Sequence, residues 1–374
     1  MRELRVILLS CACLLWVAPS AFASGGWTPV PVPSTGNNVV LSGVAAQSDS
    51  DGWAVGQQFV GAGQPQQPPV AYQWSGSAWS LTPTPQLPMY GALQGVSASS
   101  AADAWAVGFT VIGRHDRGTL VERWNGSSWS VNSLNAESGF AAGLQSVADI
   151  APDDVWAAGE GATGGLVEHW NGSSWTAATL PDPNFIPSPD DNAISALSAN
   201  DIWLAGSTLS ASTMTSVPEA MHFDGRAWSV VPFVVPDENS SALNAVAAVS
   251  ANNVWAAGEE QGAGAAIGGA TLIEHWNGVR WKIFASPTSG AYLNLTGMTA
   301  RSASDVVAVG TNEPSINGGP EHGLILRFNG TRWAIDSSDV FAGELASAAT
   351  FPGAAQEWAA GVNQSSQGLV LSHP

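Results

Sequence analysis

Apolar and polar residues alternate along most of this chain with the period of two that half-buried β-strands require. The stretch LVEHWNGSSWT, from Leu166 to Thr176, is the clearest example: a strand-like run ends in Trp170, Asn-Gly follows, and Trp175 comes three residues after the glycine. Asn-Gly between two such runs predicts a β-hairpin with a type I′ turn, whose two central residues take positive φ. Variants occur at Ala71–Ser80, Val121–Ser130, Ala220–Ser229, Ile273–Lys282 and Ile325–Ala334.

A second motif, of the form Trp-Ala-x-Gly, precedes each hairpin. Its anchor residues follow one another at intervals of 52, 51, 47, 52, 52 and 51 residues. A repeat of this length is typical of a propeller or solenoid built from stacked units. The seven anchor positions are Trp53, Trp105, Trp156, Trp203, Trp255, Val307 and Trp358.

A run of small apolar residues, such as Leu41–Ser48, comes before each anchor, so one unit contains four strands. Seven such units predict an all-β fold, a seven-bladed β-propeller of four-stranded antiparallel blades. The last unit stops at Gly368–Pro374 without a fourth strand, and Trp27–Pro33 has the pattern of the missing one. We therefore expect the N-terminal strand to close the seventh blade, which removes two open sheet edges.

The residues that recur in every unit favour structural roles. After residue 23 the chain has seventeen tryptophans, all at repeat positions, which indicates packing between blades. The glycine that ends each anchor motif indicates close backbone approach. Five aspartates lie two residues before an anchor, and we expect them to accept backbone N–H groups in the turn between the first two strands. They are Asp51, Asp103, Asp154, Asp201 and Asp305.

The first 23 residues have the organisation of a signal peptide. Arg2 and Arg5 provide the positive end, Val6–Val17 the apolar stretch and Ala21–Ala23 the cleavage site. We expect secretion to the extracellular space, no membrane insertion after cleavage, and one domain over residues 24–374. Both cysteines lie in the leader, so the mature domain would have neither a disulfide nor a cysteine nucleophile.

The formal net charge is −19, and removal of the leader leaves nine basic and twenty-nine acidic residues. Such a surface is a poor partner for nucleic acids, whose phosphates require clustered lysine and arginine. We expect a monomer whose partner is an unidentified protein or glycan.

Candidate ligand-binding residues lie in the connections between the second and third strands and between blades, which share one face of a propeller and vary in length here. Oxygen-rich loops could hold calcium, but none has the spacing of a calcium loop, so we predict no metal or other cofactor and keep calcium as an alternative. The candidate acids are Asp190, Asp191, Asp237, Glu238, Glu259, Glu260, Glu313 and Glu321.

Three histidines, His169, His222 and His275, occupy equivalent positions in the third, fourth and fifth units. Equivalent positions in neighbouring blades lie too far apart to share a zinc ion, so we expect polar cross-strand pairing with Glu122, Glu168 and Glu274. No catalytic motif stands out, and we assign no catalytic residue.

The combined pattern L-x-x-V, D-x-W-A-V-G and W-N-G-x-x-W resembles the secreted kelch-like and sialidase-type (Asp-box) repeat families, and also the photosystem II assembly-factor propellers. The resemblance covers nearly all of Trp27–Pro374 and implies the fold. It departs from kelch units, which carry paired glycines. The copper–tyrosine chemistry of kelch oxidases has no counterpart, since the mature chain has no cysteine and only three tyrosines. Sialidases need an arginine cluster, and the arginines here lie mostly in repeat turns or strands.

The sequence favours a secreted, non-catalytic binding or interaction module that uses its variable loops. Two other hypotheses stay open. One is a glycan-binding lectin with sites repeated around the ring, and the other is a hydrolase or lyase that uses loop carboxylates.

Overall fold

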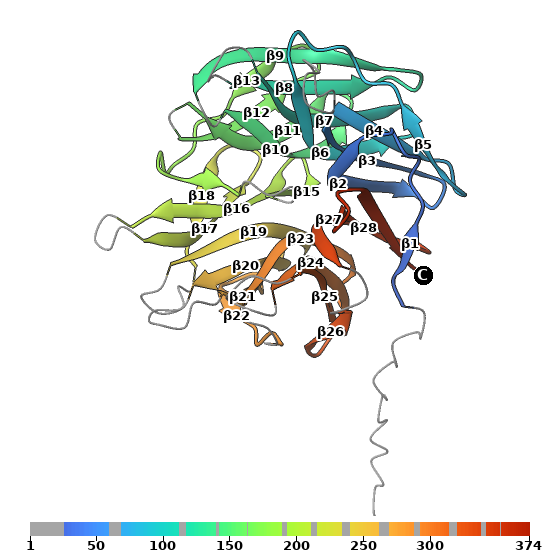
Figure 1. The fold of residues 1–374 in the computed structure, drawn as a ribbon. Helices are drawn as coiled ribbons and strands as arrows, with labels where there is room; N and C mark the ends of the chain where they lie inside the picture. Colours follow the sequence, from blue (N-terminus) through green and yellow to red (C-terminus); the bar gives the residue numbers. More distant parts are fainter. Residues whose placement is uncertain are drawn as a thin grey trace, which may run out of the picture.

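The computed structural model describes residues 26–59, 69–111, 117–139, 142–162, 164–188, 193–210, 215–233, 240–261, 269–287, 292–313, 320–337, 342–351 and 353–374. Seven sheets are arranged around one axis, with their innermost strands at the centre (Figure 1). The predicted seven-bladed β-propeller is confirmed. The described ranges contain no helix that is long and apolar enough to cross a membrane.

Six blades consist of four antiparallel strands ordered from the axis outward, and blade 4 has its inner strand in two pieces. Blade 1 contains β2 (Asn38–Ser48), β3 (Asp51–Phe59), β4 (Pro69–Trp74) and β5 (Trp79–Thr82). Blade 2 contains β6 (Gly91–Ser100), β7 (Asp103–Val111), β8 (Arg117–Trp124) and β9 (Trp129–Gly139). Blade 3 contains β10 (Gly143–Ala151), β11 (Asp154–Gly161), β12 (Gly164–Trp170) and β13 (Trp175–Ala177). Blade 4 contains β14 (Ile186–Pro187), β15 (Ile194–Ser198), β16 (Asp201–Leu209), β17 (Ser216–Phe223) and β18 (Trp228–Val231).

The remaining blades follow the same order, and blade 7 takes its outer strand from the beginning of the chain. Blade 5 contains β19 (Ser241–Ser250), β20 (Asn253–Gln261), β21 (Gly269–Trp276) and β22 (Trp281–Ile283). Blade 6 contains β23 (Tyr292–Ser302), β24 (Asp305–Glu313), β25 (His322–Phe328) and β26 (Trp333–Ser337). Blade 7 contains β27 (Gly343–Ala349), β28 (Glu357–Asn363), β29 (Gly368–His373) and β1 (Thr28–Val30).

The predicted closure of blade 7 by the N-terminal strand is confirmed. Strand β1 pairs antiparallel with β29 over three residues, from Thr28 opposite Ser372 to Val30 opposite Val370. The middle residue of β1 is Pro29, which has no N–H to donate. Further along, the Tyr72 hydroxyl donates to the carbonyl of Pro33 at 3.1 Å. The strand that completes the ring is therefore short and makes few backbone hydrogen bonds.

The hairpin turns differ from the type I′ prediction. The glycine has positive φ, for example +89° at Gly126, but the residue before it does not. The strands instead close at Trp124 opposite Trp129, so four residues form the loop. The Asn125 side-chain oxygen accepts the N–H groups of Ser127 and Ser128, both at 3.0 Å. The asparagine thus acts as a cap for the loop and needs no left-handed backbone of its own.

Tryptophans join neighbouring blades at six of the seven seams. The anchor indole of one blade contacts both hairpin aromatics of the next, as Trp53 does with Trp124 and Trp129, at ring-centre distances of 4.9 and 4.8 Å. Of the seventeen tryptophans after the leader, fifteen are buried. The indoles therefore serve as packing between blades, as predicted.

The anchor-motif glycines lie where a side chain cannot fit. A Cβ atom on Gly56 would lie 2.0 Å from the Val40 carbonyl oxygen on the neighbouring strand. The same position in blade 2, Gly108, would meet the Ala92 carbonyl at 1.9 Å. The glycines therefore meet a backbone requirement, because the first two strands of each blade approach each other closely at this position.

Candidate functional site

The five aspartates before the anchors bind side chains of the third strand, and the prediction that they accept backbone N–H groups is wrong. Asp103 forms a two-bonded ion pair with Arg123, at 2.7 and 3.1 Å. In the turn itself, serine hydroxyls accept the backbone N–H groups, as Ser100 does for Ala102 at 3.3 Å. The aspartates therefore fasten the second strand to the third within each blade.

The histidines also hold the second strand of a blade against the third. His169 Nε2 lies 2.9 Å from Asp154, and its ring stacks on Trp156 at 4.3 Å. His222 repeats this arrangement with Asp201, and His275 does so with Asn253. The expected pairing with the neighbouring glutamates is wrong, because successive residues of a strand point to opposite faces of the sheet.

An axial cavity of about 520 Å³ runs between the innermost strands of all seven blades. Its walls are mainly alanine, valine, serine and threonine, and its charged lining residues are Asp149 and Arg301. Burial, with a smaller contribution from Asp103, raises the pKa of Asp149 to about 7, although Ser99 donates to its carboxylate at 2.9 Å. Arg301 lies 3.7 Å from Asp305 and 3.6 Å from Glu357. Each of the two still has buried polar atoms without a hydrogen-bond partner among the described residues, namely Asp149 Oδ1 and Arg301 Nε and Nη2. The lining that the structure describes contains no pairing of a nucleophile with a base.

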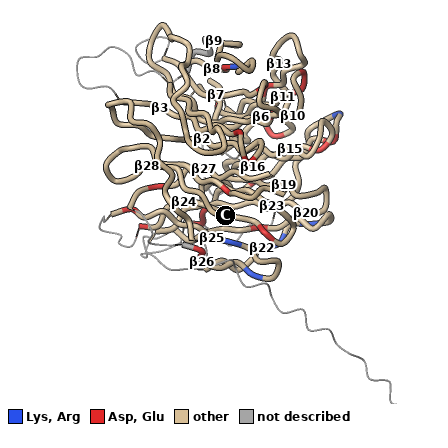
Figure 2. Tube along the Cα trace, turned by 90° about the vertical axis from the view of Figure 1, so that its right-hand side faces the viewer, with Lys and Arg blue, Asp and Glu red and all other residues tan. Residues whose placement is uncertain are grey.

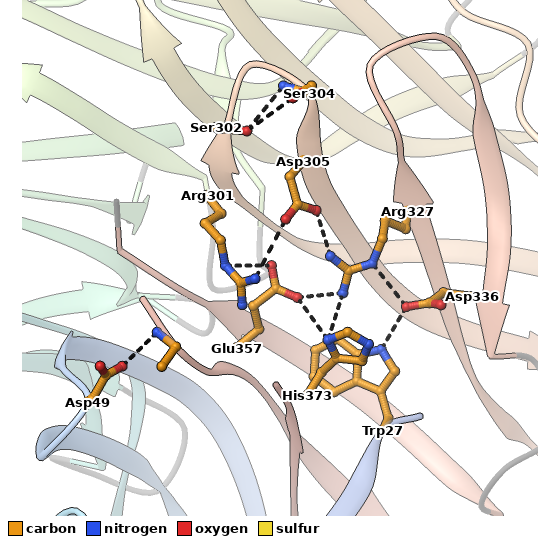
Figure 3. A network of polar contacts seen from close by, with 11 residues as sticks. Trp27, Asp49, Arg301, Ser302, Ser304, Asp305, Arg327, Asp336, Glu357 and His373 are labelled. Carbon is orange, nitrogen blue, oxygen red and sulfur yellow. Dashed lines mark hydrogen bonds and ion pairs between the residues drawn. The ribbon is translucent and has the colours of Figure 1, made fainter. Parts of the chain in front are cut away.

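The seam between blades 6 and 7 differs from the other six because a buried network of ion pairs lies in it, beside an apolar cluster (Figure 3). Val307 replaces the anchor tryptophan and His373 replaces the first hairpin aromatic. Arg327 lies at the centre, with its guanidinium 2.6 Å from Asp305, 3.1 Å from Asp336 and 2.5 Å from Glu357. We call Arg301, Asp305, Arg327, Asp336, Glu357 and His373 the polar seam.

Burial alone would lower the pKa of Arg327, but Glu357, Asp305 and Asp336 together raise it, so the guanidinium remains charged. Burial, and then the Arg327 charge, lower the pKa of His373. Glu357 is 1 % exposed and lies on blade 7, whereas Arg327 lies on blade 6. The pair therefore holds a buried charge on each side of the seam.

The predicted acids on the variable face lie in part outside the described residues. Asp190, Asp191, Asp237 and Glu238 are outside them, so their positions stay predictions. Glu259 and Glu260 lie at the end of β20, and Glu259 accepts a hydrogen bond from the Tyr292 hydroxyl at 2.5 Å. Glu259 is thus tied to the neighbouring blade.

Glu313 and Glu321 come together at the rim of blade 6, and sequence reasoning missed a third member, Glu344 of blade 7. The pKa of Glu321 is raised to about 7, mainly by its hydrogen bond to the Glu344 carboxyl, then by burial and by the Glu344 charge. A hydrogen bond with Glu313 acts in the opposite direction. These carboxyls therefore crowd one another. We call Glu313, Glu321 and Glu344 the rim triad.

Further acids lie at strand ends on the same face. Glu160 follows Gly159 as Glu259 follows Gly258, a sequence signal that could have identified it. Burial raises the pKa of Glu219 to about 7, with a smaller effect from Asp182. Among the described residues, Arg117 is the one arginine or lysine at this rim, and it stacks on Phe109 at 4.1 Å. Basic positions are few along the trace, as Figure 2 shows. The variable face is therefore acidic.

A groove of about 560 Å³ lies between blades 3 and 4 on the opposite face, where the short turns are. Asp154, His169 and Asn171 supply polar groups, and Trp156 and Phe223 supply aromatic surface. His169 keeps 30 % of its side chain exposed. The groove therefore combines an aromatic surface with hydrogen-bonding groups.

The described residues contain no group of three or more histidine, aspartate or glutamate side chains with a geometry that could hold a metal ion. The arrangement offers buried ion pairs, a small-residue cavity and an acidic rim. Of these, the acidic rim and the ion pairs of the polar seam are features that the repeat itself does not require.

No protein family model and no curated protein matches the sequence. Several solved structures are similar in fold. YCF48 bound to a D1 peptide has 13% identity and a TM-score of 0.59, and the match covers 95% of this chain and 99% of that one. A PL25 ulvan lyase bound to a saccharide has 12% identity and a TM-score of 0.56, covering 90% and 93%. The WD40 repeats of RRP9 have 10% identity and a TM-score of 0.56, covering 94% and 98%. Binding modules and an enzyme thus share this fold.

Proposed function

We propose that the chain is an exported, non-catalytic binding module whose variable face recognises a positively charged segment of a protein partner. The rim triad carries this proposal. Gathering three carboxyls destabilises a fold, because like charges repel. The equivalent strand ends of blade 1 have no such cluster, so the propeller does not need one. Lysine or arginine from a partner would relieve the repulsion.

The distribution of charge supports the same partner. An acidic face attracts a cationic surface over a distance and excludes acidic ones. YCF48, which has a similar fold, is known in complex with a peptide. By this proposal the present chain also takes a protein segment, and its kelch-like repeats serve as a rigid frame for the recognition loops.

Isothermal titration with a lysine-rich peptide tests the proposal. The triple variant Glu313→Gln, Glu321→Gln, Glu344→Gln should lose at least about tenfold in affinity at low salt. The matched control is Asp49→Asn, Asp153→Asn, Asp224→Asn, which removes the same charge from the short-turn face. Equal affinity for both triple variants would contradict the proposal. Capture from the extracellular medium with the parent chain would then identify the partner.

A glycan-binding role is a second candidate, and the groove between blades 3 and 4 favours it. Sugars stack an apolar ring face on an aromatic side chain and direct their hydroxyls to carboxylate, imidazole and amide groups. The groove has all of these. A glycan array should show binding that His169→Ala abolishes and the rim variants leave intact. No signal on the array would remove this candidate.

A further inference from the structure

The polar seam joins the two ends of the ring. Figure 3 shows Trp27, just before β1, beside Asp336 of β26 and His373 of β29. The Trp27 indole N–H donates to Asp336 at 3.0 Å, and the same carboxylate oxygen lies 3.1 Å from Arg327 Nε. The closing strand is therefore connected to Arg327 through one carboxylate. We call Trp27 together with β1 the strap.

The two guanidinium groups of the polar seam have counter-charges only while its three acids are ionised. Arg327 of β25 faces Asp305 of β24, Asp336 of β26, Glu357 of β28 and His373 of β29. Arg301 of β23 faces Asp305 and Glu357. Protonation of the acids would leave two guanidinium groups without counter-charges in a buried site, which strongly destabilises the contacts across the seam. His373 would also gain a positive charge, 3.3 Å from Arg327.

Among the described residues, none of the other six seams has an arginine paired with acids of both neighbouring blades, as Arg327 is with Asp305 and Glu357. Their anchor tryptophans pack against aromatic rings, as Trp358 does against Trp74 and Trp79 at 4.8 and 5.4 Å. Contacts between indoles do not titrate. Protonation of the acids therefore removes ion pairs from the blade 6–7 seam, whereas the indole contacts of the other seams remain.

We propose that the polar seam is an acid-operated latch, which releases the strap from blade 7 when Asp305, Asp336 and Glu357 take up protons. Release exposes the outer edge of β29, because β1 is the strand that covers it. The backbone pairing of the strap covers only three residues, one of them Pro29, and the Trp27 indole adds a buried contact in the apolar cluster that contains Val307 and Leu371. The rest of the ring keeps its seams, so the opening is local.

Hydrogen exchange measured by mass spectrometry tests the latch. Peptides containing Thr28–Val30 are compared with peptides containing Trp175–Ala177, the outer strand of blade 3, from neutral pH downward and after correction for intrinsic exchange rates. The strap should lose protection by about 100-fold at a pH where the blade 3 strand is unchanged. Loss of protection in both strands at the same pH would overturn the proposal.

Glu357→Gln should open the strap already at neutral pH, since Arg327 then lacks its most buried partner. Asp103→Asn is the control, because it removes a carboxylate from Arg123, the blade 2 counterpart of Arg327, beside an intact tryptophan seam. If Glu357→Gln does not fold, Asp336→Asn takes its place. Strap protection equal to that of the parent chain in the folded variant would overturn the latch, and if neither variant folds, the pH comparison in the parent chain decides.

Discussion

At the scale of single residues, the least expected side chain is Glu122. It is 0 % exposed, and neither carboxyl oxygen has a hydrogen-bond partner among the described residues. Burial raises its pKa to about 8. The sequence could not show that Glu122 is buried. A polar residue in an alternating strand is expected to be exposed only when one face of the sheet meets water, and here neighbouring blades cover both faces of the blade.

Glu122→Leu should stabilise the protein at alkaline pH. Leucine already stands at this position in blades 6 and 7, as Leu326 and Leu371. Because the folded-state pKa of Glu122 is raised, its carboxyl favours folding below the ordinary carboxyl pKa, and this contribution is lost as pH rises toward about 8. Denaturant unfolding near pH 8 should give the variant a gain on the order of 2 kcal/mol. Glu168→Leu is the control, because Glu168 keeps an interaction partner, and an equal gain there would refute the explanation.

At the scale of elements, the repeat pattern predicted the order and number of strands, whereas turn geometry and the inner strand of blade 4 escaped prediction. The hairpin loop has four residues because the side-chain oxygen of its asparagine accepts two backbone N–H groups within the loop. A two-residue turn does not need such a side-chain acceptor. In blade 4, Phe185 is fully buried, and β14 follows it to pair with β16 at Gly206. A bulky insertion of this kind breaks the run of small residues that marks the other inner strands.

Gly56→Ala should separate β2 from β3. The new methyl group would lie 2.0 Å from the Val40 carbonyl oxygen, which is backbone and cannot rotate away. We expect a loss of at least about 3 kcal/mol in the free energy of unfolding. Gly26→Ala, where a Cβ would meet nothing within 4 Å, should change stability by less than about 0.5 kcal/mol. Similar losses in both variants would show that the close approach is not the cause.

At the scale of the whole molecule, the repeat length of the sequence predicted the fold, but it did not predict the rim triad. Its members come from two blades, and their proximity depends on how the ring places neighbouring strand ends. Glu344 lies just before Leu345, in a strand that sequence patterns assign to the core. The spacing of residues along the chain therefore does not indicate that the three glutamates lie close together.

Stability should be greatest in mildly acidic solution. The folded-state pKa is raised to about 8 for Glu122 and to about 7 for Asp149, Glu219 and Glu321. Between about pH 5 and 7 the folded chain therefore holds protons that the unfolded chain has released, and raising the pH lowers the free energy of unfolding. Calorimetry should show a melting temperature that falls by several degrees from about pH 5 to about pH 8. A melting temperature that rises over this range would contradict these assignments.

The close contacts between indoles have a spectroscopic consequence. Two such rings at 4.8 Å and 79° to one another, as in Trp53 and Trp129, couple their electronic transitions. Repeated around six seams, this coupling should give the far-ultraviolet circular dichroism spectrum a band from tryptophan pairs in addition to the β-sheet signal. That band reports contact between adjacent blades, so a sample could keep its sheet signal and lose the tryptophan band when the ring comes apart.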